Sequence, residues 1–168
     1  HVVTANKALL AEYGNEIFAA AQARGVMVAF EGAVAVSIPI IKALREGLSA
    51  NRIEWVAGII NGTTNFILSE MRDKGLGFDE VLKEAQRLGY AEADPTFDIE
   101  GMDAAHKATI LSAIAFGIRL QYDRAYVVCL TKLAAIDIHH AFQPRSRLHL
   151  LAVSNLTPAG CNLPGGRT

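Results

Sequence analysis

Cysteines are scarce in this sequence, and their placement excludes two kinds of small stabilised fold. Cys129 and Cys161 are the two cysteines, and neither belongs to a CxxC pair or stands at ligand spacing from a histidine. We therefore expect neither a disulfide scaffold nor a zinc site, and a reducing compartment such as the cytoplasm. No apolar run reaches the roughly 18 to 20 residues of a membrane span, although 51% of the residues are hydrophobic. The sequence thus predicts a soluble protein.

The sequence also lacks an excess of charge of either sign and a glycine-rich nucleotide motif. Its 16 lysines and arginines nearly balance its 17 aspartates and glutamates, whereas a nucleic-acid surface needs clustered basic residues in excess. No GxGxxG segment follows a predicted strand, so the phosphate-binding turn of a dinucleotide fold is missing from this sequence. We expect neither nucleic acid nor a membrane as a partner. The 168 residues suffice for one domain with a buried core.

Hydrophobic periodicity and capping residues predict an alternation of helices and strands. Asn6 is a candidate cap of the first helix and Gly14 a candidate interruption, while Ser37 and Pro39 are suited to start the second helix. We expect an α+β fold of α/β-type layers, with a mixed sheet covered by helices. Helical patterns cover residues 7–24, 38–46, 64–74, 78–88, 102–116 and 134–141, strand patterns cover 26–31, 52–60, 124–133 and 147–154, and residues 155–168 are expected to be irregular or disordered.

Residues 91–107, AEADPTFDIEGMDAAHK, place five acidic residues ahead of a single lysine. Asp103 falls in the first turn of the predicted helix, where exposed N–H groups favour a carboxylate, and Lys107 follows four residues later on the same face. A capped helix with one surface ion pair accounts for these two residues. It does not account for Glu92, Asp94 and Asp98, which would repel one another unless they share a cation or a ligand with an ammonium group, such as an amino acid.

Two further segments carry candidate site residues. INGTTNFIL ends a predicted strand at Gly62, whose backbone N–H can approach a ligand closely, and puts the Thr63 hydroxyl near a helix start. An ordinary strand-to-helix cap explains the same residues. In VVTANK, Lys7 lies in the first turn of a helix, where the helix dipole disfavours a cation. It is therefore either a surface lysine or a lysine positioned for a reaction.

Four segments, taken in order, closely resemble the catalytic domain of homoserine dehydrogenases over about residues 1–120: VVTANK, FEGAVAVSIPIIKALREG, INGTTNFIL and AQRLGYAEADPTFDIEGMDAAHK. The last segment is the most specific, because its acids, proline, glycine and final lysine follow the family's spacing. The resemblance implies an oxidoreductase that interconverts L-homoserine and L-aspartate 4-semialdehyde with NADP or NAD, in threonine, methionine and isoleucine biosynthesis. It also implies a cytoplasmic homodimer whose cofactor is bound mainly by a domain that precedes VVTANK.

The resemblance also implies roles for individual residues. Lys107 and Lys7 would be catalytic and face the reacting oxygen, and Asn6 and Lys7 would contact the cofactor. Neither cysteine lies near a matched segment, which separates this chemistry from that of dehydrogenases that acylate a cysteine. The substrate would be bound by Glu92, Asp98, Asp103, Gly62 and Thr63, and a monovalent cation would be held through the backbone of Glu31, Val34, Val36 and Ile38.

The sequence departs from the family pattern at two places. The family has a glycine pair where this chain has Val36 and Ser37. The similarity weakens beyond residue 142, so we divide the chain into a homoserine dehydrogenase-like catalytic domain at 1–142 and a divergent or partly disordered segment at 143–168. The alternative function is a catalytically silent module that keeps the fold and serves amino-acid binding or dimerisation.

Overall fold

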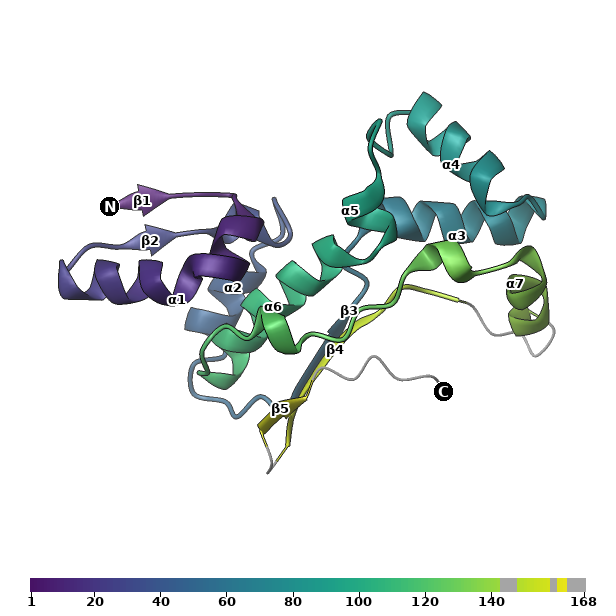
Figure 1. The fold of residues 1–168 in the computed structure, drawn as a ribbon. Coiled ribbons are helices and arrows are strands. Elements are labelled where there is room, and N and C mark those ends of the chain that lie inside the picture. Colours follow the sequence, from purple (N-terminus) through teal and green to yellow (C-terminus); the bar gives the residue numbers. More distant parts are fainter. Residues whose placement is uncertain (143–147, 158–159, 163–168) are drawn as a thin grey trace. The chain divides into compact units, whose positions relative to one another are not determined.

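A computed structural model describes residues 1–142, 148–157 and 160–162 of the chain (Figure 1). The chain divides into two compact units. The first unit comprises residues 1–60, 105–126 and the described residues from 152 onward, and the second comprises 61–104 and the described residues of 127–151. Helices combined with small sheets confirm the predicted α+β class. Over the described ranges, no helix is long and apolar enough to cross a membrane.

The first unit begins with two parallel strands joined by a helix. Strand β1 (Val2–Val3) pairs with β2 (Val28–Ala29), and α1 (Lys7–Ala23) makes the crossover that parallel strands require. Figure 1 shows α1 running alongside this strand pair. The predicted cap is confirmed, because Asn6 Oδ1 accepts a hydrogen bond of 3.0 Å from the backbone N–H of Leu9.

The predicted interruption of the first helix at Gly14 is wrong, and packing explains why. Helix α1 is continuous, and Gly14 is one of its buried residues. A Cβ atom at this position would lie 2.5 Å from Leu120 Cδ1, so the Leu120 side chain packs directly against Gly14 and would have to move for a larger residue. The side chain of Asn15 bonds both the N–H and the carbonyl of Leu120, each at 3.0 Å. Gly14 therefore serves close packing.

Three short helical pieces follow β2. They are the 3₁₀ turn η1 (Glu31–Ala33), the α-helical turn α2 (Ile40–Lys42) and the π-helical segment η2 (Ala43–Gly47). The strand predicted over 26–31 is therefore too long, because its last residue already belongs to η1.

The helix that begins with α2 is capped by a residue distant in sequence. The predicted cap is wrong: Ser37 lies before the N-cap position, which is occupied by Pro39, and Pro39 makes no side-chain capping bond. Instead, the Glu31 carboxylate accepts hydrogen bonds from the backbone N–H of Ile41 at 2.8 Å and of Lys42 at 2.9 Å. A carboxylate suits this position, because the start of a helix carries unpaired N–H groups and a partial positive charge.

An antiparallel sheet completes the first unit. Its strands are β3 (Trp55–Gly58), β4 (Ala152–Thr157) and β5 (Gly160–Asn162), paired in that order. The expectation of irregular structure is wrong for residues 155–157 and 160–162, because β3 and β4 supply pairing partners that the local sequence does not reveal. Residues 158–159 and 163–168 lie outside the described part of the chain.

The core of the first unit gathers residues of α1, the turn after β2, α2 and α6 (Met102–Phe116). Phe18 packs against this core, and its ring lies 5.3 Å from that of Phe30 within the core. Buried Ser112 of α6 donates to the Ala108 carbonyl at 2.6 Å and bonds the Ser154 hydroxyl of β4 at 2.7 Å. The buried apolar residues are Leu10, Phe30, Ala33, Val34, Ile41, Ile110, Leu111 and Leu120.

The second unit is helical, with α3 (Gly62–Lys74) at its centre. Helix α3 contacts α4 (Phe78–Arg87), α5 (Thr96–Ile99) and α7 (Ala135–Phe142), as Figure 1 also shows. This unit has a core of its own, formed by Ile67, Leu68, Met71, Val81, Ala85, Ala91, Leu130 and Ile138.

The strand predicted over residues 124–133 is wrong. The residues at its two ends belong to 3₁₀ turns, η3 (Tyr122–Arg124) and η4 (Leu130–Lys132), and residues 125–129 pair with no described strand. A Cβ atom on Gly101 would lie 2.8 Å from the Val127 side chain, and Gly101 has φ of +82°. This part of the apolar segment therefore packs against a glycine backbone in place of a neighbouring strand.

Val36 provides a test of backbone strain. It has φ of +50° and is 78% exposed, so it occupies the left-handed region with little burial to compensate. The left-handed conformation costs a side chain about 1–2 kcal/mol, whereas the greater freedom of an unfolded glycine costs about 0.5–1 kcal/mol. We expect Val36→Gly to raise the free energy of unfolding by about 0.5–1 kcal/mol in urea denaturation. Val34→Gly is the control: at φ −109° and 4% exposed, it should lose ~2 kcal/mol, and a loss at both positions would contradict the strain.

The cap provided by Glu31 gives a second test. Glu31→Ala removes both acceptors and should lower the free energy of unfolding by about 1–2 kcal/mol, while Glu31→Gln keeps one acceptor and should lose about half as much. Glu46→Ala is the control, because Glu46 meets Lys42 only in an exposed pair at 3.9 Å and should change stability by less than ~0.5 kcal/mol. Urea denaturation followed by circular dichroism measures all three, and equal losses at both glutamates would count against the cap.

Candidate functional site

A buried asparagine in the second unit binds two aspartates at once. The side-chain amide of Asn61 donates to Asp98 Oδ1 at 2.7 Å and to Asp103 Oδ2 at 2.9 Å. Its Oδ1 accepts a bond of 2.8 Å from the Thr64 N–H, which makes Asn61 the N-cap of α3. Asn61 is 5% and Asp103 4% exposed. Two of the predicted substrate residues, Asp98 and Asp103, are thus brought together by a residue that was not predicted.

The two aspartates lie at helix starts, where a carboxylate is stabilised. Asp98 belongs to the short helix α5, inside a segment that the sequence predicted to be a loop. Asp103 lies in the first turn of α6, as predicted. The first turn of a helix has N–H groups without a partner in the helix, and these favour a hydrogen-bond acceptor nearby. The pair therefore concentrates negative charge next to a buried amide.

Gly62 and Thr63 are the first two residues of α3. The predicted start at Thr64 is two residues late, because Asn61 is the cap and not a threonine. Thr63 Oγ1 donates to the Tyr90 carbonyl at 2.9 Å. Gly62 is exposed, and a Cβ atom there would meet none of the described neighbouring atoms within 4 Å. The fold therefore leaves room for a side chain at Gly62 and does not itself require a glycine.

The acidic loop is shaped by Asp94 and Gln86. Asp94 Oδ1 accepts hydrogen bonds from the Thr96 hydroxyl at 2.6 Å and the Thr96 N–H at 3.1 Å, and these bonds hold the pKa of the Asp94 carboxyl below its ordinary value. The Gln86 amide donates to the backbone carbonyls of Glu92 at 3.1 Å and Ala93 at 3.2 Å. Glu92 is exposed, and its predicted contact with a substrate stays a prediction.

Lys107 lies in the first unit, half-buried on α6. Its ammonium group donates to the carbonyl oxygen of Ile60 at 2.9 Å, two residues beyond the end of β3. An ammonium group has three N–H donors, and this bond fixes the direction of one of them. Along α6, Lys107 follows Asp103 by four residues, a spacing that puts both side chains on one face of a helix.

Lys7 and Asn6 lie in the N-terminal segment of the first unit. Lys7 is half-buried as the first residue of α1, and Asn6 is its exposed cap. The positions agree with the predicted strand-to-helix turn. Their contacts with a cofactor and a reacting oxygen stay predictions.

The four residues predicted to hold a cation follow one another along the turn after β2. The Glu31 carboxylate caps α2, and the Ile38 carbonyl accepts a bond of 2.8 Å from the N–H of Ile40. Val34 is buried and Val36 is exposed. Among the residues that the structure describes, no three His, Cys, Asp or Glu side chains gather as metal ligands. Backbone binding of a monovalent cation stays a prediction.

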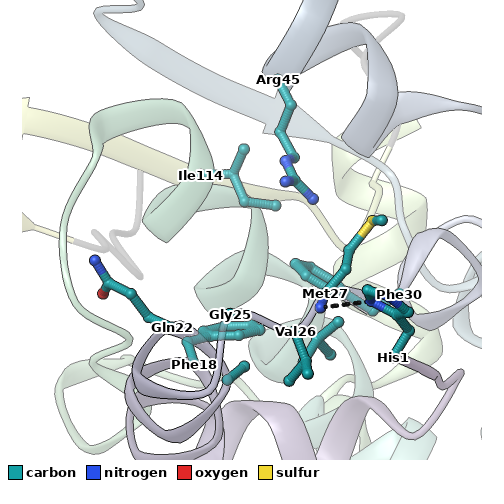
Figure 2. Close-up of a pocket in the computed structure, with 11 residues that line it drawn as sticks. His1, Phe18, Gln22, Gly25, Val26, Met27, Phe30, Arg45 and Ile114 are labelled. Atoms are coloured by element: carbon teal, nitrogen blue, oxygen red, sulfur yellow. Dashed lines mark hydrogen bonds between the residues drawn. The ribbon is translucent and has the colours of Figure 1, made fainter.

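A hollow of the first unit is lined by none of these residues. Its volume is about 650 Å³, and Figure 2 shows its lining, including the bond from the Met27 N–H to His1 Nδ1 at 3.1 Å. None of its lining residues is acidic, so it offers no counter-charge for an ammonium group. We therefore place the candidate site at the aspartates and not in this hollow. The lining consists of His1, Phe18, Ala21, Gln22, Gly25, Val26, Met27, Val28, Phe30, Arg45 and Ile114.

Sequence reasoning missed Asn61 and the Ile60 carbonyl. An asparagine between an apolar strand and a Gly-Thr pair is a recognisable helix cap, so the capping role of Asn61 had a local signal. Its bonds to the aspartates span 37 and 42 positions, so the neighbouring sequence does not predict them. The bond from Lys107 to Ile60 spans 47 positions.

Comparison with known proteins gives a consistent picture. The family model described as homoserine dehydrogenase matches residues 39–163. A homoserine dehydrogenase of Pseudomonas aeruginosa is 64% identical over 163 residues, which are 97% of this chain and 38% of that protein. The crystal structure of a homoserine dehydrogenase from Thiobacillus denitrificans superposes with a TM-score of 0.94 at 70% identity, over 96% of this chain and 37% of that one.

A more distant solved structure is a hyperthermophilic archaeal homoserine dehydrogenase in complex with NADPH. It has a TM-score of 0.77 and 30% identity, over 91% of this chain and 44% of that one. The chain thus spans well under half the length of the relatives it matches. The family match covers most of its residues, including both aspartates and Lys107. The chain belongs to the homoserine dehydrogenase family.

Proposed function

We propose that this chain is the substrate-binding part of an NAD(P)-dependent oxidoreductase that interconverts L-homoserine and L-aspartate 4-semialdehyde. The observation that carries the proposal is the pair of aspartates held on Asn61, followed on the same helix by Lys107. Both substrates are amino acids with an oxygen function at the far end of the side chain. The ammonium end of the substrate therefore requires a negative group on the protein, and the reacting oxygen requires a positive one. Helix α6 carries one of each, Asp103 and Lys107.

The aspartates would bind the ammonium group of the substrate. Asp98 and Asp103 lie in the first turns of α5 and α6, and Asn61 keeps them close together. A bound ammonium would relieve the repulsion between two carboxylates and form charge-assisted hydrogen bonds with them. Glu92 would close the same end of the site from the exposed loop, and the N–H groups of Gly62 and Thr63 would line it from the start of α3.

Lys107 would act at the reacting oxygen, with Lys7 as a second cationic group. Hydride transfer to the aldehyde carbon moves an electron pair onto the carbonyl oxygen, which then takes a proton to become the hydroxyl group of homoserine. An ammonium group within hydrogen-bonding reach stabilises that charge and can supply the proton. The bond to the Ile60 carbonyl would hold the Lys107 ammonium in one orientation for this step.

The hydride donor would be NADPH or NADH, held mainly by a domain outside the 168 residues. The sequence carries no GxGxxG turn, and the archaeal relative was solved with NADPH. Asn6 and Lys7 would contact the nicotinamide side of this cofactor. The carbonyls of Glu31, Val34, Val36 and Ile38 are hard oxygen ligands of the kind that a monovalent alkali cation takes, and they would hold it through the backbone.

The proposed setting is a cytoplasmic homodimer that serves threonine, methionine and isoleucine biosynthesis. Support for a dimer comes from the antiparallel sheet, in which β3 ends the described strand order with Trp55 63% exposed, and Leu156 of β4 is 40% exposed. An exposed strand edge with apolar side chains favours association with another chain.

A thermal-shift titration of the full-length protein tests the proposed function. L-homoserine should raise the melting temperature, and the increase should be larger when NADP⁺ is bound, because substrate and cofactor meet in one site. Reduction of NADP⁺ should accompany the addition of homoserine. Stabilisation by homoserine without any reduction of NADP⁺ or NAD⁺ would instead identify a silent binding module.

Lys107→Ala should lower kcat for homoserine oxidation by about 100-fold or more, because the group that binds the reacting oxygen and, in this direction, takes up the hydroxyl proton is lost. Asp94→Asn is the matched control within the acidic stretch: an amide oxygen can still accept both bonds from Thr96, so the loop and kcat should be retained. Steady-state kinetics of both variants measures the difference. Equal losses would remove Lys107 from its assigned role.

Gly62→Ala separates a requirement of the fold from a requirement of the ligand. The Cβ atom would enter open space, and alanine favours a helix over glycine, so the melting temperature should stay the same or rise slightly. If a substrate approaches the backbone at Gly62, the methyl group should raise KM for homoserine by about tenfold. Unchanged KM with unchanged stability would show that Gly62 lies outside the substrate site.

A further inference from the structure

We propose that Asn61 is a positioning residue for the reaction, one that fixes the spacing and orientation of Asp98 and Asp103 for the substrate ammonium. The inference rests on the proposed function and adds a residue to it. Asn61 does not itself touch the substrate in this account. It acts through the two carboxylates that its side-chain amide holds.

The hydrogen bonds of Asn61 leave its amide no freedom to rotate. Both N–H groups of Nδ2 are used, one for each aspartate, and Oδ1 accepts from the Thr64 N–H. A rotation that exchanged the amide oxygen and nitrogen would turn an acceptor toward two carboxylates and a donor toward an N–H group. The three partners therefore determine which atom of the Asn61 amide is the oxygen and which is the nitrogen.

One planar NH₂ group sets the distance between its two acceptors. The two N–H bonds of this group lie about 120° apart in the amide plane. Two hydrogen bonds of ordinary length along them therefore place the acceptor oxygens about 5 Å apart. An ammonium nitrogen that bonds both carboxylates needs a similar separation, since it too donates to two oxygens at hydrogen-bond length. Asn61 therefore holds the aspartates at a spacing that suits a second nitrogen.

Because Asn61 is buried, water cannot easily take over its hydrogen bonds to the aspartates. Asn61 and Asp103 are 5% and 4% exposed, so water has little access to the shared bond. The partners belong to three helices: Thr64 to α3, Asp98 to α5 and Asp103 to α6. The same side chain thus starts α3 and ties it to the first turns of the helices that carry the two carboxylates.

Serine distinguishes the two roles of Asn61, because it is a good helix cap with a single O–H donor. In Asn61→Ser the Thr64 N–H keeps an acceptor, but the two aspartates lose their shared donor. The readout is the preference of the full-length protein, with NADP⁺ present, for L-homoserine over 4-hydroxybutanoate, the same chain without the amino group. We expect this preference to fall by about tenfold or more in Asn61→Ser, with 4-hydroxybutanoate binding changed less than ~3-fold.

Two further variants keep the test decisive. Asn61→Thr, also a capping residue with one donor, should repeat the result if the serine variant folds poorly. Asn15→Ser is the matched control, because the Asn15 side chain bonds the backbone of Leu120 and touches neither aspartate in the described part of the chain: it should lower the melting temperature and leave the ligand preference unchanged.

The outcomes separate the two levels of the proposal. A wild-type preference for homoserine that survives in both Asn61 variants, with only the melting temperature lowered, would reduce Asn61 to a helix cap and overturn the inference while leaving the proposed function intact. A wild-type protein that binds both compounds equally would overturn the proposed function, and this inference with it.

Discussion

The second unit depends on one side-chain amide that satisfies three partners. Asn61 gives α3 its first hydrogen bond and holds a residue from each of two other helices, and all three bonds are 2.9 Å or shorter. Removing such a group leaves several buried polar atoms unpaired at once, which costs more than the loss of one ordinary bond. The buried polar centre and the apolar cluster around Ile67 therefore support the same helix.

The first unit contributes a different kind of constraint. Lys107 is oriented by a backbone carbonyl, and the Glu31 carboxylate is occupied by backbone N–H groups of α2. In both cases a charged side chain bonds main-chain groups. Such bonds fix the direction of the charged group. The Glu31 carboxylate thus has a structural role in addition to any backbone contribution to a cation site.

The sequence predicted those features that depend on neighbouring residues. The Asn6 cap, the helix that begins after Gly101 and the position of Asp103 in its first turn follow from local propensities, and the structure confirms them. The errors have distant causes. Gly14 is determined by Leu120, and the segment at 127–128 by Gly101. β4 and β5 need β3, which lies about a hundred positions earlier in the chain. At the candidate site, the charged residues were visible in the sequence, whereas the asparagine between them required the folded chain.

Helix α6 carries Asp103 and Lys107 four residues apart, and under the proposed function this spacing has a consequence for the size of the substrate. Each residue of an α-helix advances about 1.5 Å, so the two backbone positions differ by about 6 Å along the axis. A four-carbon amino acid spans a comparable length from its nitrogen to its terminal oxygen. Under the proposed function, in which Asp103 binds the amino end and Lys107 the oxygen end, a substrate one carbon shorter or longer would fit this spacing less well.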